Sequence, residues 1–256
     1  MYIDVNTIDA YAICMHHDED NLNNWRTLFP HVKIQEAVIG KKVDITDTNI
    51  VAPLTRFQLN HHSKNDSIYA VPSVGGIGCY LSHLECMKKC ISLNKPIIVI
   101  EEDVKFNEKS RSVITNALQD VPDDSKYVSL MYIRQNKNSK YNSTFCKILG
   151  DNSGFQCYLI FPEGAKIILK HALPITTQID LFVGVLLHLY PEFIGYALDE
   201  RLYSFSEIFM DNLSTDIQSF AVKKYLPSGN IFYVIVVLFI ITLVSIIIYQ
   251  NKNKNT

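Results

Sequence analysis

The chain has 256 residues, of which 48% are hydrophobic and 20% are charged, with a formal net charge of −2 at pH 7. This length suffices for one large packed domain, and the ordinary levels of charge, Gly and Pro exclude a mainly disordered or fibrous chain. A nearly neutral chain also lacks the basic excess typical of nucleic-acid-binding proteins, so no nucleic-acid partner is expected.

The N-terminal third predicts two strands separated by a helix. Residues 8–16 read as a strand, and the polar run DEDNLNN that follows can begin a helix through Trp25 and Leu28. A second short strand is expected over VKIQEAVIG, ending at Gly40. Residues 41–73 are polar and weakly periodic, which predicts a loop that includes at most one helix.

The clearest local pattern lies between residues 75 and 104. Three glycines within GGIG precede a helix expected from about Tyr80 to Leu93, and Pro96 then opens the apolar strand PIIVI. Such a run beside a helix is typical of a strand buried on both faces in a parallel α/β sheet. The α/β alternation continues with expected strands over residues 127–133 and 155–161 and a helix over residues 163–171.

Three acidic residues, Glu101, Glu102 and Asp103, follow this strand directly. Successive strand residues point to opposite sides, so Glu101 and Asp103 are expected to converge while Glu102 faces away. Two such carboxylates suit a hard cation such as Mn²⁺ or Mg²⁺, which neutralises charge that builds up on a departing diphosphate. The alternative is a solvated acidic turn that merely ends the strand.

Four potential metal ligands, Cys79, His83, Cys86 and Cys90, share one stripe of the predicted helix. The stripe is about 16 Å long, whereas zinc ligands must all lie within ~2.3 Å of one ion. One straight helix cannot bring all four together, so we interpret the stripe as the side that faces the core. His83, near the helix start beside Ser82, is still able to face a ligand.

A lone acid, Asp180, is embedded in the apolar segment PITTQIDLFVG. Burial of an unpaired carboxylate is costly, so Asp180 must have a partner, line a cleft or lie exposed at a turn. A helix cap or a surface acid is the alternative to a functional role.

The mean hydropathy of +0.07 reflects one segment, residues 231–249, which contains no charged residue. A helix over this segment spans ~28 Å, close to the ~30 Å hydrocarbon core of a bilayer, which predicts a C-terminal transmembrane helix rather than a buried core helix. Residues 1–230 then form the globular domain and residues 250–256 a short polar tail. Because the N-terminal residues do not resemble a signal peptide, we expect a single-pass anchor with the globular domain on the cytosolic side.

Taken together, these segments resemble glycosyltransferase family 25, the group of lipopolysaccharide-type and procollagen galactosyltransferases. GGIGCYLSH at residues 75–83, followed by a helix and PIIVI-EED, resembles the family signature G-E-I-G-C-x-x-S-H, a helix, and a strand ending in E-D-D. AVIG at residues 37–40 resembles its A-v-d-G step, and residues 155–165 resemble its a-Y-l-I-s-x-x-G-A segment. Asp180 falls where the family has an Asp shortly afterwards.

The resemblance implies a GT-A-like nucleotide-diphospho-sugar transferase fold. It also implies transfer of a hexose, galactose or glucose, from a UDP-sugar donor to a hydroxyl of a glycan or protein acceptor. In this interpretation Glu101 and Asp103 bind Mn²⁺ or Mg²⁺, and Asp180 contacts the acceptor or acts as its base. The residues predicted to contact the cofactor are Ser82, His83 and Glu102.

Three departures from the family pattern favour an alternative hypothesis. The Glu of G-E-I-G is Gly76 here, the middle Asp of E-D-D is Glu102, and the N-terminal strand continues as CMHH at residues 14–17 without the usual arginines. The alternative is a catalytically weakened, membrane-tethered module that binds a glycan or a protein. A metal-dependent phosphodiester hydrolase is less favoured, because it usually needs acids from several segments around two ions.

Overall fold

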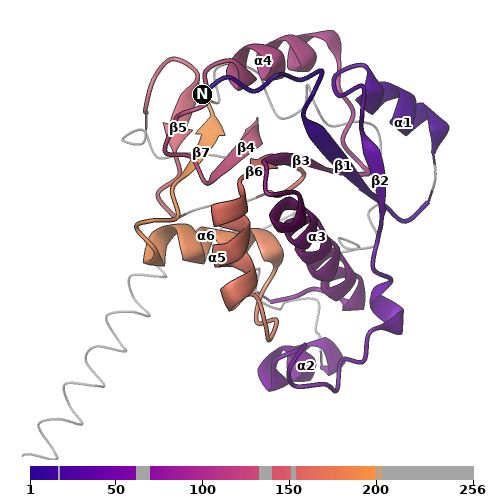
Figure 1. The fold of residues 1–256 in the computed structure, drawn as a ribbon. Coiled ribbons are helices and arrows are strands. Elements are labelled where there is room, and N and C mark those ends of the chain that lie inside the picture. Colours follow the sequence, from indigo (N-terminus) through magenta and orange to yellow (C-terminus); the bar gives the residue numbers. More distant parts are fainter. Residues whose placement is uncertain (17, 62–69, 133–139, 151–153, 200–201, 203–256) are drawn as a thin grey trace, which may run out of the picture. The chain divides into compact units, whose positions relative to one another are not determined.

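A computed structural model describes residues 1–16, 18–61, 70–132, 140–150, 154–199 and 202 (Figure 1). The predicted transmembrane helix over residues 231–249 and the tail over residues 250–256 lie outside this range. Within the described residues, none of the helices has both the length and the apolar character needed to cross a membrane. The described elements form a mixed α/β fold, in agreement with the predicted class.

A seven-stranded sheet with the order β2-β1-β3-β6-β4-β7-β5 lies at the centre of this fold. The five predicted strands correspond to β1, β2, β3, β4 and β6, although β2 ends earlier than expected, whereas β5 and β7 were not predicted. The bounds are β1 Asp9–Cys14, β2 Lys33–Glu36, β3 Ile97–Glu101, β4 Tyr127–Tyr132, β5 Phe145–Lys147, β6 Cys157–Ile160 and β7 Gly195–Leu198.

The sheet is mixed, which corrects the expectation of a parallel one. β1 is parallel to both β2 and β3, whereas β6 runs antiparallel between β3 and β4. β4 is parallel to β7, and β5 is antiparallel to β7. An apolar run indicates that a strand is buried, but it does not indicate whether the neighbouring strands run parallel or antiparallel to it. Because β6 opposes both of its neighbours, the carboxyl ends of β1, β3, β4 and β7 lie at one edge, where open α/β sheets bind ligands.

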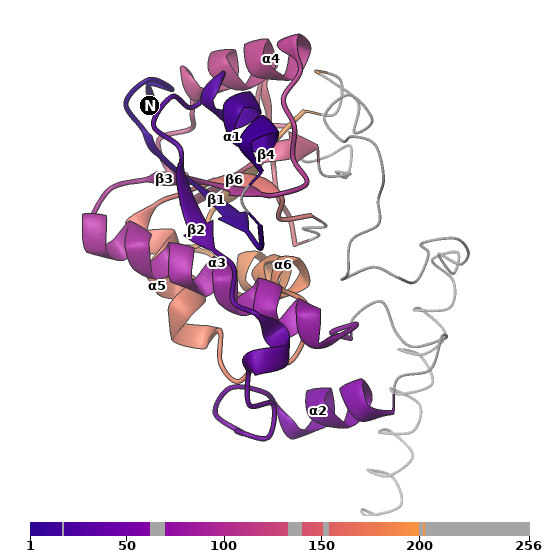
Figure 2. The ribbon, with the colours of Figure 1, turned by 90° about the vertical axis from the view of Figure 1, so that its right-hand side faces the viewer.

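Helices cover both faces of the sheet (Figures 1 and 2). Ile98 and Ile100 of β3 belong to the core cluster under α1 and α4, and Ile97 and Val99 belong to the cluster under α3, α5 and α6. All four side chains are fully buried, which confirms that β3 is covered on both faces. The helix bounds are α1 Glu19–Arg26, α2 Pro53–Asn60, α3 Val74–Leu93, α4 Glu108–Leu118, α5 Pro162–His171 and α6 Ile179–Leu189.

Helix α3 begins at Val74, six residues before the predicted start at Tyr80. Ser73 caps it, because its hydroxyl accepts a hydrogen bond from the Gly76 amide at 3.3 Å. The expected start at Tyr80 placed the three glycines before the helix, whereas the structure includes them in its first turns. Gly76, one of the departures from the family pattern, therefore lies in the first turn of α3, where its amide is capped.

Tertiary packing explains the glycines at this helix start. A Cβ atom on Gly78 would lie 2.3 Å from the carbonyl oxygen of Val38, and a Cβ on Gly40 would lie 1.8 Å from the carbonyl oxygen of Val74. Only glycine permits this backbone approach. The close contact fixes the first turns of α3 against residues 38–40, and it thereby positions the side chains of α3 that face the carboxyl end of β3.

Candidate active site

The acidic triplet lies at the carboxyl edge of the sheet, as predicted. Glu101 is the last residue of β3, and Glu102 and Asp103 form a turn closed by a hydrogen bond from the Val104 amide to the Glu101 carbonyl oxygen at 3.1 Å. The strand alternation used for the prediction therefore stops at Glu101. Glu102 turns toward the end of β1, where its Oε2 accepts a hydrogen bond from the Met15 amide at 2.8 Å.

Asp103 carries an unusual carboxylate. Among the described residues, its Oδ1 atom is shielded from solvent and has no hydrogen-bond partner. Burial and the negative charge of Glu101 raise the pKa of Asp103 to about 7. The same part of the structure shows no lysine or arginine in an ion pair with Glu101 or Asp103. Among the described residues, the negative charge of Glu101 and Asp103 is thus not neutralised by a lysine or an arginine.

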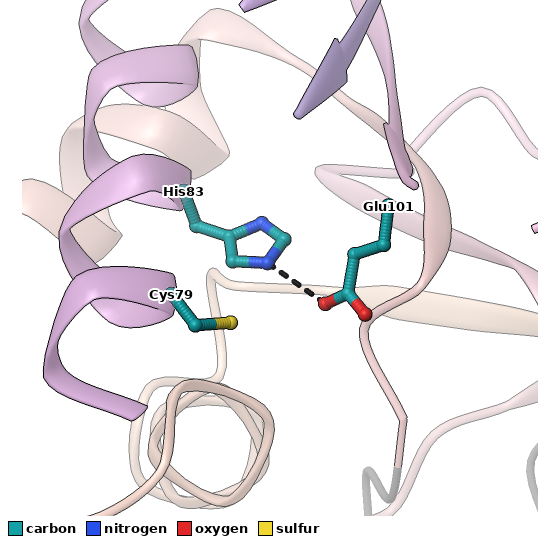
Figure 3. A group of neighbouring side chains, drawn as sticks. All are labelled: Cys79, His83 and Glu101. Atoms are coloured by element: carbon teal, nitrogen blue, oxygen red, sulfur yellow. Dashed lines mark hydrogen bonds and ion pairs between the residues drawn. The ribbon is translucent and has the colours of Figure 1, made fainter. Parts of the chain in front are cut away.

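Helix α3 contributes His83, which is fully buried and reaches Glu101 across the gap between helix and sheet (Figure 3). Its Nε2 lies 3.0 Å from Oε1 of Glu101, and its Nδ1 lies 2.9 Å from the hydroxyl oxygen of Tyr158 on β6. An ionised carboxylate only accepts hydrogen bonds, so Nε2–H of His83 donates to Glu101, and in this tautomer Nδ1 accepts a hydrogen bond from the Tyr158 hydroxyl. This chain of contacts fixes the orientation of the Glu101 carboxylate.

Cys79 lies one helical turn before His83 and points toward the same space (Figure 3). Its Sγ, a ring nitrogen of His83 and a carboxylate oxygen of Glu101 all lie within 4.8 Å of one another. Burial, together with the charges of Glu101, Asp180 and Asp103, raises the pKa of the Cys79 thiol well above its ordinary value. Cys79 was not among the predicted site residues, although its spacing from His83 placed both on one helix face.

The remaining cysteines of the stripe, Cys86 and Cys90, are fully buried and belong to the core, in agreement with the interpretation from the sequence. Cys86 and Cys90 therefore cannot bind the same ion as Cys79 and His83, because four ligands along one straight helix cannot converge. Two ligands from adjacent turns can still share an ion with a residue from another element.

Asp180 lies in the first turn of α6, near enough to Glu101 for the charge of Glu101 to act on it. Its Oδ2 accepts a hydrogen bond from the Gly154 amide at 3.1 Å, and its Oδ1 accepts one from the Leu181 amide at 2.7 Å. Burial raises the pKa of Asp180, and the charge of Glu101 contributes in the same direction. The structure therefore brings together acids from β3, the following turn and α6, which are separated by about 80 residues of sequence.

Ser82 faces the interior rather than the acidic cluster. Its fully buried hydroxyl accepts a hydrogen bond from the Val38 amide at 2.8 Å and donates one to the Gly78 carbonyl oxygen at 2.7 Å. These contacts hold α3 against residues 38–40. A direct contact of Ser82 with the cofactor stays a prediction from the sequence.

The family model described as glycosyltransferase family 25 (LPS biosynthesis protein) matches residues 31–183, which is more than half of the chain. The chain belongs to glycosyltransferase family 25. The match contains α3, β3, the acidic turn, β6 and the first turn of α6, so it includes every residue of the cluster described above. Membership of family 25 makes the chain a glycosyltransferase, with a sugar donor and an acceptor as its partners. A search of curated proteins found no match to the chain.

Proposed function

We propose that this family 25 glycosyltransferase transfers galactose or glucose from a UDP-sugar to a hydroxyl of a glycan or protein acceptor and depends on Mn²⁺ or Mg²⁺. The observation that carries the proposal is the shielded Oδ1 atom of Asp103 beside Glu101, which has no hydrogen-bond partner among the described residues. An oxygen of this kind is costly to bury in a metal-free protein and is suited to ligate a hard cation.

The residues present fit such an ion. Glu101 and Asp103 supply carboxylate oxygens, the preferred ligands of Mn²⁺ and Mg²⁺, and their mutual repulsion favours a cation between them. His83 holds Glu101 in a fixed orientation through the 3.0 Å contact, as residues behind a metal ligand commonly do. A divalent ion bound here neutralises the negative charge that develops on the leaving nucleoside diphosphate.

Asp180 is the residue suited to receive the proton of the acceptor hydroxyl. Its raised pKa makes it a stronger base than an exposed aspartate, and its two backbone hydrogen bonds fix the carboxylate at the start of α6. Glu101 and Asp103 would hold the ion, and Asp180 would receive the proton of the acceptor hydroxyl. In this proposal the residues that serve the donor belong to β3 and the turn after it, and the residue that serves the acceptor belongs to α6.

Release of UDP by the purified full-length chain in detergent, with UDP-galactose or UDP-glucose and Mn²⁺, tests the proposal. We expect activity that is lost on chelation and falls at least about 100-fold in Asp103→Asn, because the charge of the leaving group is no longer neutralised. Asp120→Asn, which alters an exposed aspartate, is the matched control. Inactivity with all common UDP-hexoses, or full activity of Asp103→Asn, contradicts the proposal.

We also propose that residues 231–249 anchor the enzyme in a membrane with its globular domain in the cytosol. Their length and lack of charge support this proposal. Protease protection of the full-length chain in sealed vesicles tests the orientation, and extraction by alkaline carbonate overturns the anchor.

A further inference from the structure

We propose that Cys79, His83 and Glu101 form a second cation site, which takes a softer divalent ion of the Zn²⁺ class and shares Glu101 with the hard-cation site. The two sites differ in chemistry, because the first offers only carboxylate oxygens and the second offers sulfur, nitrogen and oxygen. Thiolate and imidazole favour Zn²⁺ over Mn²⁺ or Mg²⁺.

The geometry is close to that of a bound ion. Zn²⁺ lies ~2.0–2.3 Å from its sulfur, nitrogen and oxygen ligands, so ligands at tetrahedral positions are about 3.5 Å apart. The three ligand atoms here all lie within 4.8 Å of one another. Cys79 and His83 are four residues apart on α3, a spacing that places both side chains over the same helix face.

The surroundings of His83 also suit a metal ligand. A metal-bound imidazole usually makes a hydrogen bond through its other ring nitrogen. Nδ1 of His83 already has such a partner in the Tyr158 hydroxyl at 2.9 Å. When Nε2 binds an ion, the neutral ring carries its proton on Nδ1, and Nδ1–H then donates a hydrogen bond to the Tyr158 hydroxyl oxygen, which can also accept.

Charge and access also favour an ion at this position. The Asp103 carboxylate lies in the turn that directly follows Glu101, and this negative charge attracts a cation. On binding, the thiol proton leaves to solvent, and the ion takes its place on the sulfur. The Glu101 side chain is 23% exposed, so an ion can enter past this carboxylate.

Occupation of this site removes Glu101 from the hard-cation site, and Zn²⁺ therefore inhibits the Mn²⁺-dependent reaction. This consequence rests on the proposed function, whereas binding itself does not. Raised Mn²⁺ should relieve the inhibition, since the two ions compete for one carboxylate.

Cobalt is the optical probe for the site. Titration of the reduced full-length chain with Co²⁺ should produce a thiolate-to-cobalt absorption band, and Zn²⁺ should displace Co²⁺ because it binds such sites more tightly. Cys79→Ser should remove the band and weaken Zn²⁺ binding more than 10-fold. Cys90→Ser is the matched control: Cys90 is on the same stripe, and its sulfur contacts two carbonyl oxygens that a serine hydroxyl can also contact.

Tyr158→Phe keeps all three ligands and tests the site without altering them. We expect a roughly 10-fold loss of Zn²⁺ affinity, the usual scale for removal of a partner behind a ligand. A wild-type chain without the cobalt band, or an undiminished band in Cys79→Ser, overturns the inference. A Cys79-dependent band in a chain that is inactive with every UDP-hexose keeps the inference and contradicts the transferase proposal, so the two failures are distinguishable.

Discussion

Asp103 combines two properties that conflict in a metal-free protein: its carboxylate is largely buried, and Glu101 lies beside it. A raised pKa means that the folded state holds the proton more tightly than the unfolded state. The stabilising effect of that proton is present at low pH and is lost as the pH rises through about 7. Above neutral pH the ionised Asp103 side chain therefore destabilises the metal-free fold. A bound cation would offset this unfavourable charge.

Asp103→Asn should consequently stabilise the metal-free chain. At pH 8 with a chelator, we expect its free energy of unfolding to exceed that of wild type by about 2 kcal/mol, with a smaller gain as the pH falls toward 5. Urea unfolding at both pH values measures this difference. A variant less stable than wild type at pH 8 would contradict this, because it would show that contacts within the fold stabilise the ionised Asp103 carboxylate.

Asp9 illustrates the opposite case at the other end of β1. It forms ion pairs with Lys33 at 2.8 Å and Lys95 at 2.6 Å, and these hydrogen bonds lower its pKa. A lowered pKa contributes stability above the unfolded value of 3.8, and that stability is lost as the pH falls through the lower folded value.

Asp9→Asn should therefore lower the free energy of unfolding at pH 7 by about 1 kcal/mol, the scale of two exposed ion pairs. The difference from wild type should disappear at a pH below the folded pKa. Denaturant unfolding across this range checks the prediction, with Asp120→Asn as a control. If the difference in the free energy of unfolding between the variant and wild type does not depend on pH, it arises from packing rather than from the ion pairs.

Among the elements, α3 depends on a close backbone contact near its start. Gly78 approaches the Val38 carbonyl oxygen so closely that an added Cβ would lie 2.3 Å from it. Neither partner can rotate away, because both contacting groups are backbone. Displacement of α3 would also move His83 and Cys79 relative to β3.

Gly78→Ala should lower the free energy of unfolding by roughly 2 kcal/mol or more, although alanine is the better helix former by about 1 kcal/mol. Gly76→Ala is the control, since its Cβ would meet side-chain atoms, the nearest being Val71 Cγ1 at 3.0 Å. We expect a clearly smaller effect there. Thermal unfolding of both variants measures the difference, and equal effects would refute the role of the backbone contact.

The elements show which features a sequence can predict. β3 and the acidic triplet were predictable, because an apolar run with charged residues at its end has few other interpretations. The start of α3 was not, since the close contact of Gly78 with Val38 joins residues 40 positions apart. The same limit applies to the site: the 3.0 Å contact of His83 with Glu101 and the proximity of Asp180 depend on tertiary packing. Likewise, the residues of β6 contain no pattern that predicts its antiparallel direction.

In the domain as a whole, the site residues come from α3, β3 and α6, so the site exists only when the sheet and both helices are assembled. Ligands that bind such a site bind the folded state alone. They should therefore stabilise the whole cooperative unit rather than one segment.

Mn²⁺ with UDP should raise the melting temperature of the full-length chain. At 100 times the dissociation constant the gain in free energy is ~2.7 kcal/mol, which corresponds to roughly 5–10 °C for a domain of this size. Differential scanning calorimetry with and without chelator measures the shift, and Asp103→Asn should abolish the Mn²⁺-dependent part. No shift with either ligand would favour the alternative of a weakened glycan- or protein-binding module.

The contact of Tyr158 with His83, and of His83 with Glu101, runs from the centre of the core to the acidic turn. Tyr158 is fully buried on β6, where a change to phenylalanine conserves shape and apolar character. In most cores such a change is nearly neutral for function. Here it removes the hydroxyl that contacts His83. We therefore expect Tyr158→Phe to reduce sugar transfer, so that a fully buried position of the core affects the activity proposed for the acidic turn.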